Sequence, residues 1–547
     1  MKNRLWLISI VLFLVLFAVG FYFFLPALNF QSDSFYLFIV MIFAISLAPL
    51  FLSAATVTQR YNQKILTFAS TPLLKVFGVC GILVAVYLAG ALIFSPAFSS
   101  SRYAERITVT DGSFAEDIAE VDLDNLPLLD KDSTQRVGDR VMGQLPELIS
   151  QFEVSDQYTQ ISYQGRLVRV TPLEYAGLFK WLGNRAEGSP GYILVDSTTG
   201  EASLVKLEHG MKYLTSAYFN ENLHRLIRFQ YPTEMLATSV FEIDDDGNPF
   251  FITPVVSMKW VGILPDIKGA IVTDPISGDS TYYNISDVPL WVDHVYPSSL
   301  VLEQINDWGT YQNGWLNSFI GQKNVRQSTE GYTYLSDETD IFIYTGITSA
   351  AADESNIGFI LTNLRTKETK FYAVPGAEEF SAMSSAEGAV QEKGYTSTFP
   401  LLINLNGRPT YLSSLKDSAG LVKSYAFVDV QDYQKVKVTD STSGLEVAAA
   451  SYLSMIGNEV ISVDESEEFA GVIDSIESVV IDGNTYFYIT LVNEPTIFKA
   501  PINTDDRLPF LSENIHISFT HSNGVILKIN AIQAPLIEPT TPTESGE

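Results

Sequence analysis

The 547-residue sequence holds one cysteine, Cys80, and only five histidines. A single cysteine cannot form an intrachain disulfide, so the chain must fold on its hydrophobic cores alone. The histidines are scattered, and none shows the His-x-x-x-His spacing of a zinc site. We therefore expect no metal and no cofactor, and expect ordinary surface or interfacial roles for all five: His209, His224, His294, His516 and His521.

Basic residues are also scarce. Lys and Arg number 34 against 63 Asp and Glu, which gives a formal net charge of −29. A field of that sign disfavours nucleic acid and anionic lipid head groups, and it favours cations or basic partners. The charge balance therefore predicts a protein that binds no nucleic acid.

Signatures of catalysis are missing from the sequence. It contains no Gly-x-Ser-x-Gly, no P-loop and no dinucleotide fingerprint. Ser413 to Lys416 has the Ser-x-x-Lys spacing of penicillin-interacting enzymes, but no Lys-Thr-Gly or Ser-Asp-Asn partner accompanies it. We predict no catalytic residue and no enzyme.

Acidic clusters offer the remaining alternatives. Asp244 to Asn248 lacks the alternating acids and the later Glu of a calcium loop, so we interpret it as a turn. Asp464 to Glu468 is interpreted as a solvated linker. An enzyme would require acids from separate segments to converge in one pocket, for example Asp353 and Glu354 with Glu378 and Glu379.

Three almost wholly apolar runs stand near the N-terminus: Leu5 to Leu28, Phe35 to Val57 and Leu74 to Phe98. Each exceeds the roughly 20 residues that cross a bilayer, so they predict three transmembrane helices. The alternative for the first run, a cleaved signal peptide, fits poorly because the run is too long and no small-residue cleavage site follows.

Basic residues flank these runs on one side. Lys2 and Arg4 precede the first, and Arg60 and Lys64 lie between the second and third. The positive-inside rule then predicts a multi-pass protein of the cell membrane, with a cytoplasmic N-terminus and a large extracellular C-terminal region. An exported region without disulfides favours a Gram-positive cell envelope.

One stretch recurs through the rest of the chain. Gly191 to Glu201 (GYILVDSTTGE) returns as Gly269 to Asp279 and Gly358 to Glu368, and a degraded copy spans Ser424 to Asp429. In every copy an apolar run is followed by Asp or Asn five residues after the start, as in a strand that enters an Asx-capped turn. Short hairpins precede the copies, with turns at Gln164-Gly165, Asp246-Gly247 and Asn406-Gly407 and a weaker one at Asp337-Glu338.

Segments with helical spacing accompany these hairpins. Lys131 to Leu145 is one, with Asp132 or Ser133 as its N-cap, and the others follow the hairpins. We therefore predict four tandem units, each a small antiparallel sheet backed by helices. The helical segments after the hairpins are Met211 to Ile227, Ser298 to Trp308, Glu378 to Val390 and Glu446 to Ile456.

Closely spaced β runs between Phe469 and Ile532 predict a five-stranded barrel like the OB-fold. Tryptophans are expected to pack in cores between neighbouring units rather than to line a groove. They are Trp181, Trp260, Trp291, Trp308 and Trp315.

The strand that ends in Asp-x-x-Thr-Gly-Glu resembles the ending of PepSY modules, a family of small exported α+β domains. Asp196, Thr199, Gly200 and Glu201 match that ending, and Asp274, Ser277, Gly278 and Asp279 match it conservatively. The third copy departs from it at Lys367, where Gly is expected, and the fourth keeps only Asp429. The resemblance implies a binding module or a regulator of peptidases, and it transfers no active site.

The sequence thus predicts an α+β chain with a membrane anchor, tandem PepSY-like units and a small barrel. Its function would be that of a non-catalytic, membrane-anchored binding or scaffold protein that contacts envelope proteins or peptides, with inhibition or regulation of an envelope peptidase or hydrolase as the alternative. The predicted division is 1–98 anchor, 99–157 stalk, 158–235, 236–325, 326–395 and 396–459 units one to four, 460–533 barrel and 534–547 disordered tail.

Overall fold

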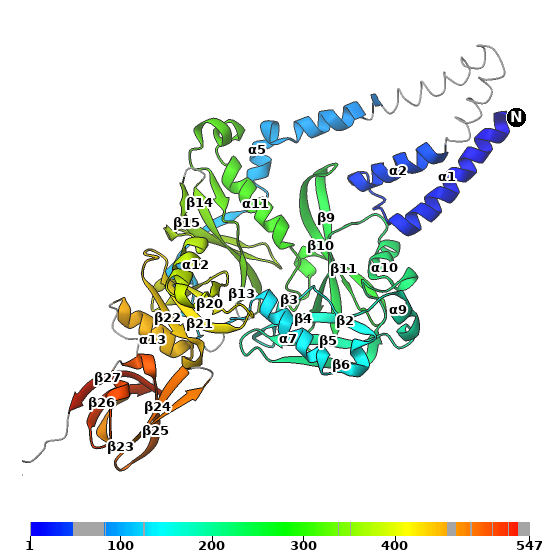
Figure 1. Cartoon of the computed structure of the whole chain (residues 1–547). Helices are drawn as coiled ribbons and strands as arrows, with labels where there is room; N and C mark the ends of the chain where they lie inside the picture. Colours follow the sequence, from blue (N-terminus) through cyan, green and yellow to red (C-terminus); the bar gives the residue numbers. More distant parts are fainter. Residues whose placement is uncertain are drawn as a thin grey trace, which may run out of the picture. The chain divides into compact units, whose positions relative to one another are not determined.

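The computed structural model describes residues 2–46, 81–123 except 83, 126–336, 339–349, 352–456, and 467–533 except 482, 483, 506, 523 and 524. The chain divides into two compact units. The first comprises Met1–Asp117 and Asn125–Glu378, and the second comprises Ile118–Asp124 and Glu379–Glu547. Figure 1 labels the elements of both.

The N-terminal apolar runs are largely helical where the structure describes them. Within the described residues no single helix is long and apolar enough for a membrane span; Val84–Ile93 and Pro96–Ala104, which meet at 55°, satisfy that criterion only as a bent pair. The predicted three-span anchor and the multi-pass membrane location that depended on it are therefore wrong. Positive φ at Leu25 interrupts the first run, and Pro96 interrupts the third.

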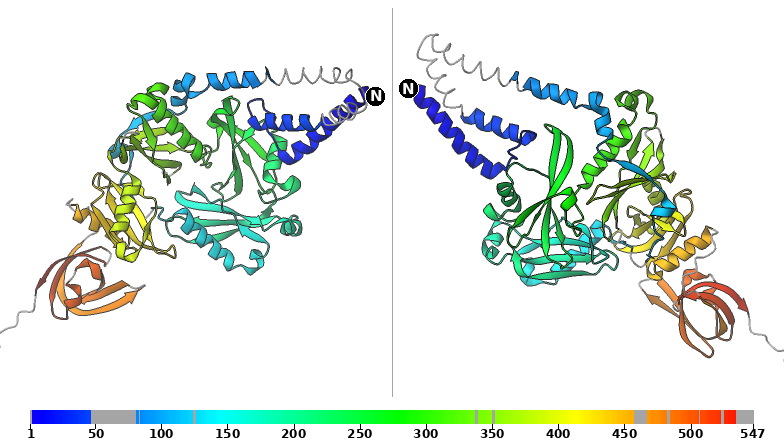
Figure 2. Two further views of the ribbon diagram at one scale, coloured as in Figure 1. Left: turned by 45° about the horizontal axis from the view of Figure 1, so that its top comes forward. Right: turned by 180° about the vertical axis from the view of Figure 1, so that it is seen from behind.

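Helix α1 (Lys2–Phe24) and helix α2 (Asp33–Ser46) lie side by side (Figure 2). Phe38 and Ile42 of α2 are buried, and Phe17 of α1 packs against Phe38 at 5.5 Å between ring centroids. The end of the second predicted run, the start of the third, Arg60, Lys64 and Cys80 lie outside the described residues.

Four sheets share one strand order, in which an edge strand, a long strand and two further strands follow in sequence and a short strand pairs with the long one. The orders are β2-β4-β5-β6 with β3 (sheet 1), β7-β9-β10-β11 with β8 (sheet 2), β12-β14-β15-β16 with β13 (sheet 3) and β18-β20-β21-β22 with β19 (sheet 4). Sheet 3 also includes β1, parallel to β16, and β17. Each copy of the recurring stretch therefore lies in a sheet with the same strand order.

The strands of sheets 1 and 2 are β2 (Phe152–Val154), β3 (Thr159–Tyr163), β4 (Arg166–Tyr175), β5 (Ser189–Asp196), β6 (Ala202–Met211), β7 (Met235–Leu236), β8 (Val240–Ile243), β9 (Pro249–Trp260), β10 (Ile263–Thr273) and β11 (Ser280–Asn284). Those of sheets 3 and 4 are β1 (Val109–Gly112), β12 (Arg326–Ser328), β13 (Thr333–Ser336), β14 (Ile341–Ser349), β15 (Ala352–Asn363), β16 (Thr369–Tyr372), β17 (Gly376–Ala377), β18 (Thr396–Ser397), β19 (Leu401–Leu405), β20 (Arg408–Lys416), β21 (Val422–Asp429) and β22 (Val436–Asp440). The predicted boundary at 158 therefore separates β2 from its own sheet.

The recurring stretch lies on the third strand of each sheet: β5, β10, β15 and β21. Its opening glycine is needed because the neighbouring strand comes close. A Cβ atom would meet a main-chain oxygen at 2.0 Å at Gly191, 2.3 Å at Gly269 and 2.1 Å at Gly358. The pairing register shifts immediately before all four starts, Ser424 included, as at a β-bulge.

Sheet 2 explains why its copy of the stretch is apolar at consecutive positions. Ile271 belongs to one hydrophobic core, whereas its neighbours Ala270 and Val272 belong to another. Successive side chains of a strand point to opposite faces, so sheet 2 is buried on both faces. One face shares a core with sheet 1 and the other with sheet 3.

The helices pack against these sheets and against one another. Helix α7 packs on β5 and β6, α11 on β12 and α5, α12 on β20 and β21, and α13 on β21 and β22. The N-cap of α7 is Asp130, whose carboxylate accepts from the Ser133 N–H, rather than Asp132 or Ser133. The helices are α5 (Pro96–Ala104), α6 (Phe114–Asp117), α7 (Lys131–Gly143), α8 (Pro146–Ile149), α9 (Leu178–Asn184), α10 (Leu223–Gln230), α11 (Ser298–Tyr311), α12 (Glu379–Gly388) and α13 (Leu445–Met455), with short turns η2 (Phe219–Glu221) and η3 (Ile285–Asp287).

Of the helices predicted after the hairpins, the first differs most from the structure. The predicted segment Met211 to Ile227 begins at the end of β6, and helix α10 starts only at Leu223, where the Asn222 side chain caps it.

The C-terminal strands pair in the order β23-β24-β25-β27-β26, and β26 pairs back to β23, so the ring closes. Their bounds are β23 (Glu467–Ile481), β24 (Asn484–Leu491), β25 (Glu494–Pro501), β26 (His516–Ser522) and β27 (Val525–Gln533); the predicted tail 534–547 lies outside the described residues.

Candidate functional site

The most unusual group of ionisable side chains lies where sheets 1, 2 and 3 meet, around the loop between η3 and α11. Glu242 of β8 is fully buried, and its carboxylate accepts from the main-chain N–H groups of Asp293 and His294, both at 2.9 Å. Asp293 is 1% exposed and its Oδ2 accepts from the Ser162 N–H of β3 at 2.7 Å. We call Glu242, Asp293 and His294 the junction cluster.

The same loop reaches sheet 3. The N–H groups of Val295 and Tyr296 both donate to the carbonyl of Leu364, at 3.1 and 2.8 Å. The His294 ring stands edge-on to Tyr334 of β13, with 5.7 Å between centroids. One loop therefore ties three sheets together through polar contacts that are shielded from water.

Burial dominates the electrostatics of the junction cluster. It raises the pKa of Glu242 to about 7, although the two N–H bonds pull in the other direction. Burial and then the negative charge of Glu242 raise the pKa of Asp293 well above its ordinary value. Burial lowers the pKa of His294 to about 4, and because its Nε2 lies 2.7 Å from the Gln160 carbonyl, which only accepts, the neutral ring carries its proton on Nε2.

The hydrogen bonds of this cluster run mainly to the main chain of neighbouring sheets. Ionising Glu242 or Asp293 places a charge in a buried site, so the raised pKa of each carboxyl makes this junction sensitive to pH. The group therefore acts on how the three sheets are held together.

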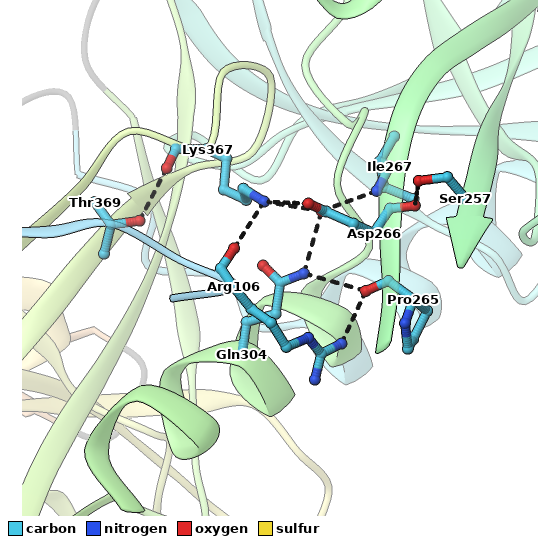
Figure 3. A network of polar contacts seen from close by, with 8 residues as sticks. All are labelled: Arg106, Ser257, Pro265, Asp266, Ile267, Gln304, Lys367 and Thr369. Atoms are coloured by element: carbon cyan, nitrogen blue, oxygen red, sulfur yellow. Dashed lines mark hydrogen bonds and ion pairs between the residues drawn. The ribbon is translucent and has the colours of Figure 1, made fainter. Parts of the chain in front are cut away.

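A second polar network joins sheets 2 and 3 and includes the lysine that interrupts the repeat (Figure 3). Lys367 occupies the left-handed region at φ 68°, where the other units have Gly200 at 74° and Gly278 at 84°. Its Nζ contacts both carboxylate oxygens of Asp266, at 2.8 and 2.9 Å, and donates to the Arg106 carbonyl at 3.1 Å. We call Lys367, Asp266 and Arg106 the clamp.

Helix α11 completes the clamp. The Gln304 amide donates to Asp266 Oδ1 at 3.2 Å, and the Arg106 guanidinium donates to the Pro265 carbonyl at 2.9 Å (Figure 3). Arg106 also pairs with Glu303 at 2.6 Å and with Asp307. Lys367 therefore accepts the steric cost of a positive φ, which glycine would avoid, and forms a partly buried ion pair between sheets 2 and 3.

An exposed apolar surface covers α9 and η2. Phe179 is 84% and Phe219 56% exposed, and Phe219 holds φ 52°, an uncommon conformation for a bulky residue. Trp181 is buried beneath them, with ring centroids 5.6 Å from Tyr218 and 5.8 Å from Phe219. We call this the α9 surface: Leu178, Phe179, Leu182, Tyr218 and Phe219.

The Asx residues predicted from the repeat all cap their turns. Asp196 and Asn363 each accept from the two N–H groups two and three residues later, at 2.9 Å. Asp429 does the same at 2.9 Å, and Asp274 accepts from the Ile276 N–H at 2.7 Å. This part of the prediction is confirmed at all four turns.

Other predicted positions are not brought together. Ser413 and Lys416 lie three residues apart on β20, so their side chains leave opposite faces of the strand. Asp244 caps its own turn by accepting from the N–H groups of Asp246 and Asn248. Among the described residues, no group of three or more His, Cys, Asp or Glu side chains is arranged to hold a metal ion.

The structure does not test the acids suggested for a converging pocket, because it does not describe all of their side chains. Glu379 is buried at the start of α12, whereas the side chains of Asp353 and Glu354 and most of the segment Asp464 to Glu468 lie outside the described residues. Trp181 and Trp308 are buried in cores as predicted, and Trp291 packs against Phe250 at 4.9 Å. His209 and His516 are exposed, and His521 packs among Phe469, Phe498 and Phe519.

The junction cluster was missed because Glu242 lies 51 residues before the adjacent pair Asp293 and His294, and the three residues follow no motif. Glu242 in an otherwise apolar strand, Phe241-Glu242-Ile243, was the one available signal, since a charged residue between buried neighbours requires partners.

No protein-family model matches the sequence, and no curated protein matches it, so the resemblance to PepSY modules stays a prediction.

Proposed function

We propose that this chain is a non-catalytic binding or scaffold protein whose α9 surface docks a partner protein. The observation that supports this most directly is Phe219, which is held exposed at positive φ beside exposed Phe179. Strain of this kind costs on the order of 1–3 kcal/mol and is concentrated at binding and switch sites. Exposed aromatics over a buried tryptophan are typical of interface anchors.

The partner's chemistry follows from charge. The chain carries a net charge of −29, so long-range attraction selects a basic protein, and the apolar α9 surface then selects one with an exposed apolar segment. Sheets 1 to 3, joined by the junction cluster and the clamp, would serve as the rigid frame that presents this surface.

Photo-crosslinking tests the proposal. Benzoylphenylalanine at position 179 is expected to capture one basic protein, identified by mass spectrometry, in the cells that make the chain. The same probe at Phe510, which is 82% exposed, is the matched control. Phe219→Ser should weaken capture at position 179 about tenfold or more, since interface anchors typically contribute 2 kcal/mol or more.

Identical adducts from positions 179 and 510, or no adduct at 179, would count against the proposal. If the captured protein were a peptidase whose activity changed on adding the purified chain, the alternative role of peptidase regulator would be favoured. That role derives from the PepSY resemblance, and the four Asx-capped turns are the feature that speaks for it.

A further inference from the structure

A cavity of about 520 Å³ lies between the α1–α2 hairpin and the side of sheet 2 that carries β7 and α10. Its volume is within the range of small-molecule sites. The wall is mostly apolar and includes three methionines, which adapt to ligands of different shape. The lining includes the apolar side chains of Phe38, Met235 and Met258 and the polar side chains of Asp33, His224 and Arg228.

The hairpin wall of this cavity is fastened to sheet 2 and α10 at several points. The Leu28 N–H donates to the Pro232 carbonyl at 2.8 Å, and the Asn29 amide donates to the Thr233 carbonyl at 3.0 Å. On the helix side, Arg225 Nε donates to the Tyr22 carbonyl at 3.1 Å. The cavity is therefore part of the folded unit.

Arg228 gives the cavity a buried positive end. It is 3% exposed, and its Nη1 donates to the carbonyls of Tyr231, at 3.3 Å, and Glu234. Its Nε is buried and has no hydrogen-bond partner among the described residues. Burial lowers the pKa of Arg228 to about 10, so the side chain stays charged at neutral pH.

Glu234 is the acid whose negative charge acts on Arg228, but no carboxylate oxygen forms a hydrogen bond with the Arg228 guanidinium among the described residues. The Glu234 carboxylate pairs with Lys268 at 2.5 Å, and Asp33 Oδ1 accepts from the Ser34 N–H at the start of α2. No ion pair of Arg228 is present among the described residues. A buried guanidinium N–H without an acceptor favours an incoming anion, because charged hydrogen bonds are the stronger ones.

We propose that this cavity binds a single-chain amphiphile with an anionic head, the head meeting Arg228 beside His224 and the chain lying against Phe38, Met235 and Met258. A fatty acid or an alkyl phosphate supplies this chemistry. The site is separate from the α9 surface, so this inference and the proposed function can succeed or fail independently.

Calorimetric titration of the full chain with dodecanoate, below its micelle concentration, tests the site. We expect saturable one-to-one binding, and binding of dodecanol weaker by about tenfold or more because the head then lacks charge. Dodecyl phosphate against dodecanoate distinguishes a phosphate from a carboxylate head. Stronger binding of dodecyltrimethylammonium would overturn the proposal, since it would assign the head to Asp33.

Variants separate this site from nonspecific uptake of the alkyl chain. Arg228→Met should lower dodecanoate affinity about tenfold while leaving dodecanol binding unchanged. Lys259→Met is the matched control, because Lys259 is an exposed cation of β9 that does not line the cavity. Met258→Trp, which fills the cavity without touching Arg228's carbonyl bonds, should abolish binding of both ligands; unchanged binding in Met258→Trp would overturn the proposal even if Arg228→Met failed to fold.

Discussion

At the scale of single residues, the junction cluster shows how position overrides residue type. Burial raises the pKa of the acids Glu242 and Asp293 and lowers the pKa of the base His294, so the fold shifts each group away from its charged form. The sequence shows many acids on a chain of net charge −29, yet most carboxylates of such a chain are simply solvated. Glu242 and Asp293 differ from such solvated acids because they lie where three sheets meet.

The cluster predicts a pH dependence whose sign can be worked out. Glu242 has a folded pKa of about 7, above its ordinary value of 4.5, so its contribution is complete below pH 4.5 and is lost as pH rises through 7. His294 has the opposite shift, from 6.5 to about 4, so its contribution is lost only as pH falls below 6.5. Between pH 6.5 and 8 the carboxyls outweigh His294, whose ordinary pKa of 6.5 still opposes them at the lower end of this range, and the free energy of unfolding should drop by about 0.5 kcal/mol or more.

Urea unfolding of the first unit at pH 6.5 and 8 measures this drop. Glu242→Gln should flatten the dependence, although it also weakens one bond to the loop. Glu201→Gln, at an exposed position, is the control and should leave the slope unchanged. A slope in Glu242→Gln equal to that of the unaltered chain would show that the carboxyl is ionised in the folded state.

At the scale of elements, the turn after the recurring strand was predictable because its signals are local. An Asx residue, a left-handed residue and the strand before them all lie within about ten residues, and each acts on its immediate neighbours. The helix predicted from Met211 was wrong up to Asn222: Met211 still pairs with Ser189 of β5, and helix α10 begins only at Leu223. That pairing joins segments about twenty residues apart, which local periodicity does not register.

Substitutions at Lys367 separate the cost of its positive φ from the contribution of its ion pair with Asp266. Lys367→Met keeps the left-handed backbone and removes the ion pair with Asp266, whereas Lys367→Gly removes both the ion pair and the strain. We expect Lys367→Met to be more destabilising than Lys367→Gly by about 1 kcal/mol, the usual cost of positive φ at a non-glycine residue. Urea midpoints of the two variants measure the difference.

The matched control is Gly200→Lys in sheet 1. It places a lysine at the equivalent turn, at φ 74°, where no acid takes the part of Asp266. It should destabilise by about 1 kcal/mol. If Gly200→Lys were neutral, positive φ would cost nothing in this turn, and the ranking of the two Lys367 variants would have to come from the ion pair and packing alone.

At the scale of the whole molecule, the repeat explains the sheets but not how the chain is divided. Sheets 1 to 3 belong to one compact unit because sheet 2 has two apolar faces, and sheet 4 belongs to the other. The prediction of three membrane-spanning helices from the apolar runs was wrong because it also relied on the sequence pattern alone. Hydropathy counts side chains along the chain, and it does not register the break at Leu25 or the bend at Pro96.

The short segment 118–124 belongs to the second compact unit, although the rest of that unit begins only at Glu379. Residues 118–124 belong with the second unit, where the Val121 N–H donates to the Asn404 carbonyl at 2.9 Å and the Asn404 amide donates to the Ile118 carbonyl at 2.8 Å. Asn404 is 6% exposed on β19, so both bonds are shielded from water.

Asn404→Leu removes the side-chain bond to Ile118 and leaves the main-chain bond in place. Hydrogen exchange at Val121 should then speed up about fivefold, because one shielded hydrogen bond contributes about 1 kcal/mol to local opening. Exchange in sheet 1 should stay unchanged, which separates local release from global loss of stability. Asn406→Gly, at the exposed β19–β20 turn two residues on, is the control. Equal exchange at Val121 in Asn404→Leu and the unaltered chain would mean that the main-chain bond alone fastens this segment, and the second unit would then be held together by its sheet and ring of strands without the Asn404 side chain.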